Sequence, residues 1–202
     1  MNELQKNKIK TTFKYTWPLY LVTAILSVVL MGVIFKVSHR TPGYKTLTFF
    51  VSGEMTDQKQ LEKDLLEKYE DNDLKSISCI SADPATDTNY YRKLSVSGYN
   101  TADVLIIPES RTKAETFVAS AFALDLGEEI INTYYSGYTF WEQEDIKYGI
   151  KIDKDKVSQY MTLPSEDCYM FISAKSENIG EYSSKPNEKH NNALNVVKDW
   201  GM

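Results

Sequence analysis

Residues 17–35 read WPLYLVTAILSVVLMGVIF and contain no charged side chain. Nineteen helical residues at about 1.5 Å each span roughly 28 Å, close to the thickness of the hydrocarbon core of a bilayer. We therefore expect a transmembrane helix over residues 15–37, through which the lipid bilayer is a partner of this chain. This helix divides the chain into a short basic tail, residues 1–14, and one domain that follows the helix.

A cleaved signal peptide is the alternative for an apolar segment near an N-terminus. The apolar core of such a peptide is about 7 to 15 residues long and ends at small residues. The run here is longer, and residues 35–40, FKVSHR, offer no such cleavage site. We therefore expect an uncleaved anchor. Four lysines precede the run, whereas two lysines and one arginine follow it before residue 46, and flanking basic residues stay in the cytoplasm. This bias favours a cytoplasmic N-terminus and an extracytoplasmic domain at the cell membrane.

The part of the chain after the anchor has the size of a single domain. Residues 38–45 are expected to form a tether, and residues 46–202 are long enough to bury a core of their own. From residue 38 onward the chain carries 18 Lys plus Arg against 27 Asp plus Glu, a formal charge of −9. Nucleic-acid binding requires a basic face, so this class of partner is excluded.

Strand-like and helix-like segments alternate in the first half of the domain. The run at 102–107, ADVLII, is typical of a buried parallel strand. Asp57, with Gln60 three residues later, marks the start of an amphipathic helix. Alternation of this kind predicts an α/β fold, here one three-layer lobe with a mostly parallel sheet. The expected elements are strands at 46–52, 74–81 and 102–107, and helices that begin near residues 57, 87 and 110.

The pattern is looser in the second half of the domain. We expect helices at 128–135 and 193–200, strands at 147–152 and 168–173, a turn or short helix at 153–159, and a polar loop at 183–191.

Two cysteines, Cys79 and Cys168, each lie in an apolar strand-like run. A disulfide between them is one alternative in an extracytoplasmic compartment. Two buried free thiols are the other, which we favour. The sequence has no C-x-x-C spacing and no His/Cys cluster, so neither a metal nor another cofactor is predicted.

Candidate ligand-binding residues follow from the predicted sheet, because ligands of open α/β sheets bind beyond the carboxyl ends of the strands. Short hydroxyl and acidic side chains at these ends could hold a small polar ligand. The alternative is that they are turn and helix-cap residues. The residues are Ser52, Glu54, Ser81, Asp83, Glu109 and Ser110.

An aromatic cluster at residues 134–141, YYSGYTFW, is the other candidate. Its rings could stack on a sugar, cover the core or face a partner protein. We predict that Tyr138 and Trp141 lie on the side of the carboxyl ends of the strands and form a partial second wall of the site. No nucleophile beside a base, no calcium loop and no phosphate-binding glycine loop is present, so we do not expect an enzyme.

Five short segments resemble the extracellular solute-binding proteins of bacterial ABC importers. They are LEKDLLEKY at 61–69 after the first strand, YRKL at 91–94 before Gly98, ADVLII at 102–107, YGI at 148–150, and FISAKSEN at 171–178 followed by AL at 193–194. The chain departs from the family at Lys151, where a proline is expected, and in length, since members have two lobes and about twice as many residues. The resemblance implies a periplasmic-binding-protein-like lobe that captures or senses a small polar solute, such as a sugar, without catalysis. The alternative is an envelope interaction module, in which the lobe docks another envelope protein or a second copy of itself.

Overall fold

The computed structural model describes residues 3–38, 41–114 and 117–202. The chain divides into two compact units, Met1–Thr41 and Pro42–Met202. The first contains one long helix, α1 (Glu3–Ser38). Its segment Lys14–Phe35 has a mean hydropathy of 2.4 and is long and apolar enough to cross a membrane, as predicted. Residues 39 and 40 of the expected tether lie outside the described residues, and Gly43–Lys45 forms a 3-10 turn (η1) at the start of the second unit.

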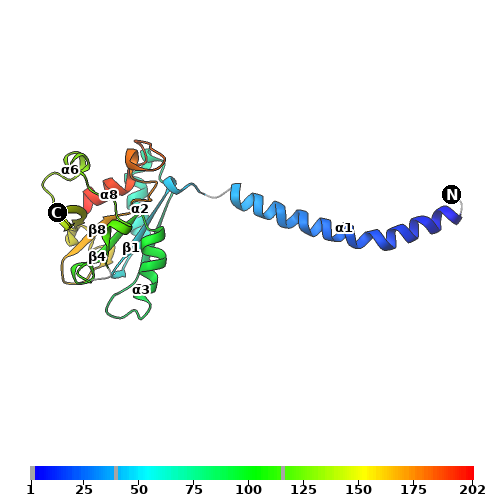
Figure 1. Ribbon diagram of the computed structural model, residues 1–202, viewed down its shortest axis with the longest axis horizontal. Helices are drawn as coiled ribbons and strands as arrows, with labels where there is room; N and C mark the ends of the chain where they lie inside the picture. The colour runs from blue at the N-terminus through cyan, green and yellow to red at the C-terminus, as the bar shows by residue number, and fades with distance from the viewer. Residues whose placement is uncertain (1–2, 39–40, 115–116) are drawn as a thin grey trace. The chain divides into compact units, whose positions relative to one another are not determined.

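A six-stranded sheet forms the centre of the second unit (Figure 1). The strand order is β3-β1-β4-β8-β6-β5. Strands β3, β1 and β4 are parallel, whereas β8 is antiparallel to both of its neighbours and β5 is antiparallel to β6. Four of the six strands therefore point the same way, which confirms the predicted α/β fold with a mostly parallel sheet. The strands are β1 (Thr46–Val51), β3 (Ser76–Ser81), β4 (Val104–Pro108), β5 (Phe140–Gln143), β6 (Ile146–Lys151) and β8 (Cys168–Ile172).

Helices cover both faces of the sheet. Successive side chains of a strand point to opposite faces, so neighbouring residues of β1 enter different core clusters. Phe49 lies in a core cluster with residues of α2 (Gln58–Lys68), α6 (Glu128–Tyr134) and α8 (Asn192–Trp200). Its neighbour Phe50 lies in a second cluster with residues of the helical run 90–101. The domain therefore has three layers, and Figure 1 shows α8 and α3 on opposite sides of the strands.

Helix α2 begins where the sequence predicts. The Asp57 side chain accepts a hydrogen bond from the Gln60 backbone N–H at 3.0 Å. Leu61 and Leu65 point into the core. The predicted C-terminal helix is also present as α8, with Leu194 and Trp200 buried.

The helical run 90–101 changes its hydrogen-bonding pattern in the middle. It consists of α3 (Tyr90–Lys93), a π-helical segment, η3 (Leu94–Gly98), and α4 (Tyr99–Thr101). The remaining short elements are β2 (Glu54–Met55), η2 (Glu70–Asn72), α5 (Glu109–Thr112), η4 (Ala119–Ala121), α7 (Lys154–Val157), β7 (Met161–Thr162) and η5 (Gly180–Tyr182).

The two cysteines lie on strands that are not neighbours in the sheet, Cys79 on β3 and Cys168 on β8. Both are free thiols, as favoured from the sequence. Burial raises the pKa of the Cys79 thiol to about 12 and that of the Cys168 thiol to about 11.

Candidate functional site

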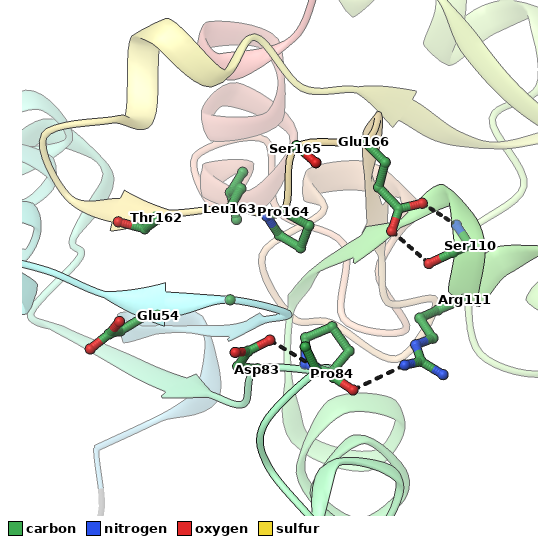
Figure 2. Close-up of a pocket in the computed structure, with 12 residues that line it drawn as sticks. Glu54, Asp83, Pro84, Ser110, Arg111, Thr162, Leu163, Pro164, Ser165 and Glu166 are labelled. Atoms are coloured by element: carbon green, nitrogen blue, oxygen red, sulfur yellow. Dashed lines mark hydrogen bonds between the residues drawn. The ribbon is translucent and has the colours of Figure 1, made fainter.

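A pocket of about 380 Å³ lies at the carboxyl ends of β1, β3 and β4, the edge of the sheet that the sequence indicates. We call it the strand-end pocket (Figure 2). One wall follows the strands and consists of residues 53–54, 83–85 and 110–111. The opposite wall is the segment 162–166.

The two walls are held together by backbone pairing. Strand β2 pairs with β7 in a separate two-stranded antiparallel sheet, with Glu54 opposite Thr162. Gly53 makes this approach possible, because a Cβ atom at this position would overlap the Thr162 carbonyl oxygen. A glycine is therefore required where the segment 162–166 crosses the end of β1.

Side chains also fix the segment 162–166 in place. The Glu166 carboxylate accepts two hydrogen bonds from Ser110, from the backbone N–H at 2.7 Å and from the hydroxyl at 2.6 Å. From the other side, the Lys154 ammonium donates to the carbonyl oxygens of Pro164 at 2.6 Å, Ser165 at 2.9 Å and Glu166. Bonds from a charged group to carbonyl oxygens are the stronger kind of protein hydrogen bond, so this wall is well fixed.

Arg111 supplies the positive charge of the lining. Its guanidinium donates to the Tyr91 hydroxyl at 2.6 Å and to the Pro84 carbonyl at 3.0 Å. The guanidinium carbon lies 5.7 Å from the ring centre of Tyr90 and 5.5 Å from that of Tyr91, within the range of cation–π attraction. Among residues 41–114 and 117–202, Arg111 has no carboxylate ion-pair partner, and its buried Nε has no hydrogen-bond acceptor.

Three carboxylates lie in the lining, and they differ in how many hydrogen bonds they accept from the protein. Asp83 accepts from the Ala85 backbone N–H at 2.9 Å and the Thr86 hydroxyl at 2.8 Å, which lowers its pKa. Glu166 accepts both of its hydrogen bonds from Ser110. The Glu54 side chain is exposed and makes no hydrogen bond or ion pair in the described structure, so its carboxylate is free to accept from a ligand.

Three of the residues predicted from the sequence line the strand-end pocket, namely Glu54, Asp83 and Ser110. Three others lie beside it. Ser52 is fully buried below the pocket, where its hydroxyl bonds that of Tyr90 at 2.8 Å. Ser81 ends β3, and Glu109 pairs with Lys113 at 2.8 Å.

The aromatic cluster does not form the second wall, which corrects the prediction for Tyr138 and Trp141. The Tyr138 hydroxyl donates to the Lys198 carbonyl at 2.8 Å, which holds the ring against the end of α8. The Trp141 ring packs edge-on against Phe117 and Phe171, each at 5.3 Å. Tyr138 packs against the first core cluster and Trp141 against the second, so the two side chains lie on opposite faces of the sheet.

The sequence analysis missed Arg111 and the segment 162–166. Arg111 directly follows Ser110, so the rule that selected strand ends would have reached it one residue later. The segment 162–166, TLPSE, carries a turn signal in Pro164 but no sign that it crosses the sheet. Only the fold brings it to the ends of β1 and β4.

Comparison with known proteins assigns no family. No family model matches the chain, and no curated protein does. Among solved structures, the chain is similar to an ABC substrate-binding protein of Listeria monocytogenes in complex with cycloalternan, with 13% identity and a TM-score of 0.29. The match covers 56% of this chain and only 32% of that protein. A likeness of this size carries no conclusion about function.

Proposed function

We propose that this chain is a membrane-anchored, extracytoplasmic binding protein of the solute-binding type, which captures or senses a small polar solute without catalysis. The observation that carries the proposal is the strand-end pocket, enclosed between the ends of β1, β3 and β4 and the segment 162–166. A volume of about 380 Å³ lies within the range of small-molecule sites, roughly 300 to 1,000 Å³.

The anchor is supported by α1. Its segment Lys14–Phe35 has 22 residues, which corresponds to about 33 Å of helix, and none of this segment is buried against the chain. Residues 17–35 all expose their side chains, so a bilayer is the environment that would remove them from water. The charge bias of the flanks supports a cytoplasmic N-terminus.

The topology is tested with protease added to intact protoplasts, which should remove the domain and spare an N-terminal tag. Protection of the domain would show the opposite orientation. N-terminal sequencing of the mature protein distinguishes an anchor from a signal sequence, because cleavage after residue 35 would eliminate the anchor.

The lining favours a ligand rich in hydrogen-bond donors. Asp83 and Glu166 already accept hydrogen bonds from the protein. The Glu54 carboxylate is free to accept from a ligand, and Arg111 can donate to a ligand oxygen. No aromatic ring lines the pocket in the described structure, so recognition would rest on hydrogen bonds rather than stacking. A single sugar or an amino acid fits this chemistry.

Thermal shift of the full chain in detergent against a panel of sugars and amino acids tests the ligand. A solute at 100 times its Kd should stabilise the domain by about 2.7 kcal/mol. Glu54→Gln should weaken binding about tenfold or more, because a hydrogen bond to a charged group is lost. Glu67→Gln, on the exposed face of α2, is the matched control.

The alternative is an envelope interaction module that docks another protein. A panel without any shift would reject solute capture and favour this alternative. A shift that Glu54→Gln leaves unchanged would place the ligand elsewhere.

A further inference from the structure

Strand β3 forms one edge of the six-stranded sheet, with β1 as its neighbour on one side only. Ala82, next to β3, donates its backbone N–H to the Val51 carbonyl at 3.0 Å. Backbone groups of a strand alternate between its two sides, so Ile77, Cys79 and Ser81 turn their N–H and C=O groups to the free edge. In the described structure, no turn or loop segment makes a backbone hydrogen bond to Ile77, Cys79 or Ser81.

This edge lacks the features that prevent strands from pairing with other chains. Such features are charges, prolines, bulges and short length. Strand β3 reads SISCIS, six residues without a charge or a proline, and its register with β1 is regular. The opposite edge, β5, has only four residues, a register shift between Trp141 and Glu142, and a charge. One edge of the sheet is protected and the other is open.

We propose that β3 pairs with β3 of a second copy of this chain, antiparallel, about a two-fold axis through Cys79. A two-fold axis perpendicular to the sheet keeps each face on its own side, as in isologous dimers. It sets Ile77 opposite Ser81 of the second copy and Cys79 opposite Cys79. The outward N–H and C=O groups of these residues then bond each other, and the two sheets become one.

The charges beside β3 select this register. Lys75 precedes the strand and is exposed, and Asp83 follows it. Neither has an ion-pair partner in the described structure. Centring the pair on Cys79 brings Lys75 of each copy beside Asp83 of the other. Centring it on Ser78 would set Lys75 opposite Ser81 instead and leave the charges unpaired.

Sedimentation of the full chain in detergent micelles tests the dimer. The unmodified chain should form a dimer. Ser81→Pro removes one outward N–H from each copy but none of the hydrogen bonds to β1, so it should abolish the dimer, whereas Ser81→Ala should keep it. Lys75→Glu should raise the dissociation constant about tenfold, because two attractive pairs become repulsive. Lys63→Glu, on the exposed face of α2, should have no effect.

Cross-linking tests the register. Opposed residues that exchange backbone hydrogen bonds have Cα atoms about 5.5 Å apart, within the range for a disulfide. Copper phenanthroline should therefore link two copies through Cys79 in a Cys168→Ser background. If Ser81→Pro does not fold, Lys75→Glu alone decides. A monomer at every concentration overturns the proposal. A dimer that neither Ser81→Pro nor Lys75→Glu weakens overturns it as well. An unchanged dimer without the cross-link overturns the register.

Discussion

Asp103 carries the sharpest prediction about pH. It precedes β4 at the end of the sheet away from the strand-end pocket. Its carboxylate accepts hydrogen bonds from the Thr48 backbone N–H at 2.8 Å, the Ser176 hydroxyl, and the Asn178 amide at 3.4 Å. Desolvation outweighs these three bonds, and the nearby Glu177 adds to it, so the pKa of Asp103 rises from 3.8 to about 6.

The sign of the pH effect follows from this shift. A carboxyl group with a raised pKa binds its proton more tightly in the folded state, so its ionisation destabilises the fold. The free energy of unfolding therefore falls as pH rises from about 4 to about 6 and stays low above it. A difference of about two pKa units corresponds to about 3 kcal/mol. We take this as an upper bound, since the residue is half-buried.

The perturbation is Asp103→Asn, which keeps the shape and removes the charge at every pH. The amide keeps one acceptor oxygen and replaces the other by an NH2 group, so part of the hydrogen bonding from Thr48, Ser176 and Asn178 is lost, at a cost of about 1 to 3 kcal/mol that does not depend on pH. Urea unfolding of the full chain and of the variant is compared between pH 4.5 and 8. Part of the effect lies below pH 4.5, so the advantage of the unmodified chain should shrink by up to about 2 kcal/mol across this range.

Contributions from other carboxylates, including those whose pKa is lowered, cancel in this difference. An advantage that grows with pH would refute the reasoning, because it would show that the three hydrogen bonds outweigh desolvation. A difference that does not change with pH would refute it as well.

Three further outcomes follow from the packing. Trp141→Ala should lower the free energy of unfolding by about 2 to 3 kcal/mol in urea titrations, since the half-buried ring packs on the core. An unchanged midpoint would return this side chain to the list of binding residues. Gly53→Ala should destabilise by about 1 to 3 kcal/mol in thermal unfolding, because its methyl group meets backbone of the opposite wall. Gly127→Ala, which meets nothing within 4 Å, is its control. In a Cys79→Ser background, Cys168 should react slowly with iodoacetamide at pH 8 and rapidly after unfolding, because its side chain is fully buried and burial raises its thiol pKa. Rapid labelling of the folded chain would contradict this burial.

Local patterns in the sequence determined the elements whose physical causes are local. The apolar run 17–35 specifies α1 because the run alone is long enough to be a span. Asp57 specifies the start of α2 because its carboxylate reaches an N–H three residues away. The run ADVLII predicts a strand that is buried on both faces, and β4 is buried throughout.

Tertiary structure decided the direction of the later strands. Strands β5 and β6 are joined by Glu144 and Asp145, whose φ angles are 53° and 63°. This is the left-handed turn that makes tight antiparallel hairpins, usually marked by glycine or asparagine. Neither residue gives that signal, so the hairpin was not predicted. Strand β8 then enters between β4 and β6 in the opposite direction, which only its partners define.

The same division holds for the strand-end pocket. Glu54, Asp83 and Ser110 could be predicted because each follows its own strand along the chain. The wall at 162–166 could not, because its position depends on Gly53 and on the bond from Ser110 to Glu166, across 56 residues of chain. Contacts between residues far apart in sequence leave no periodic signal, and they decide where the pocket closes.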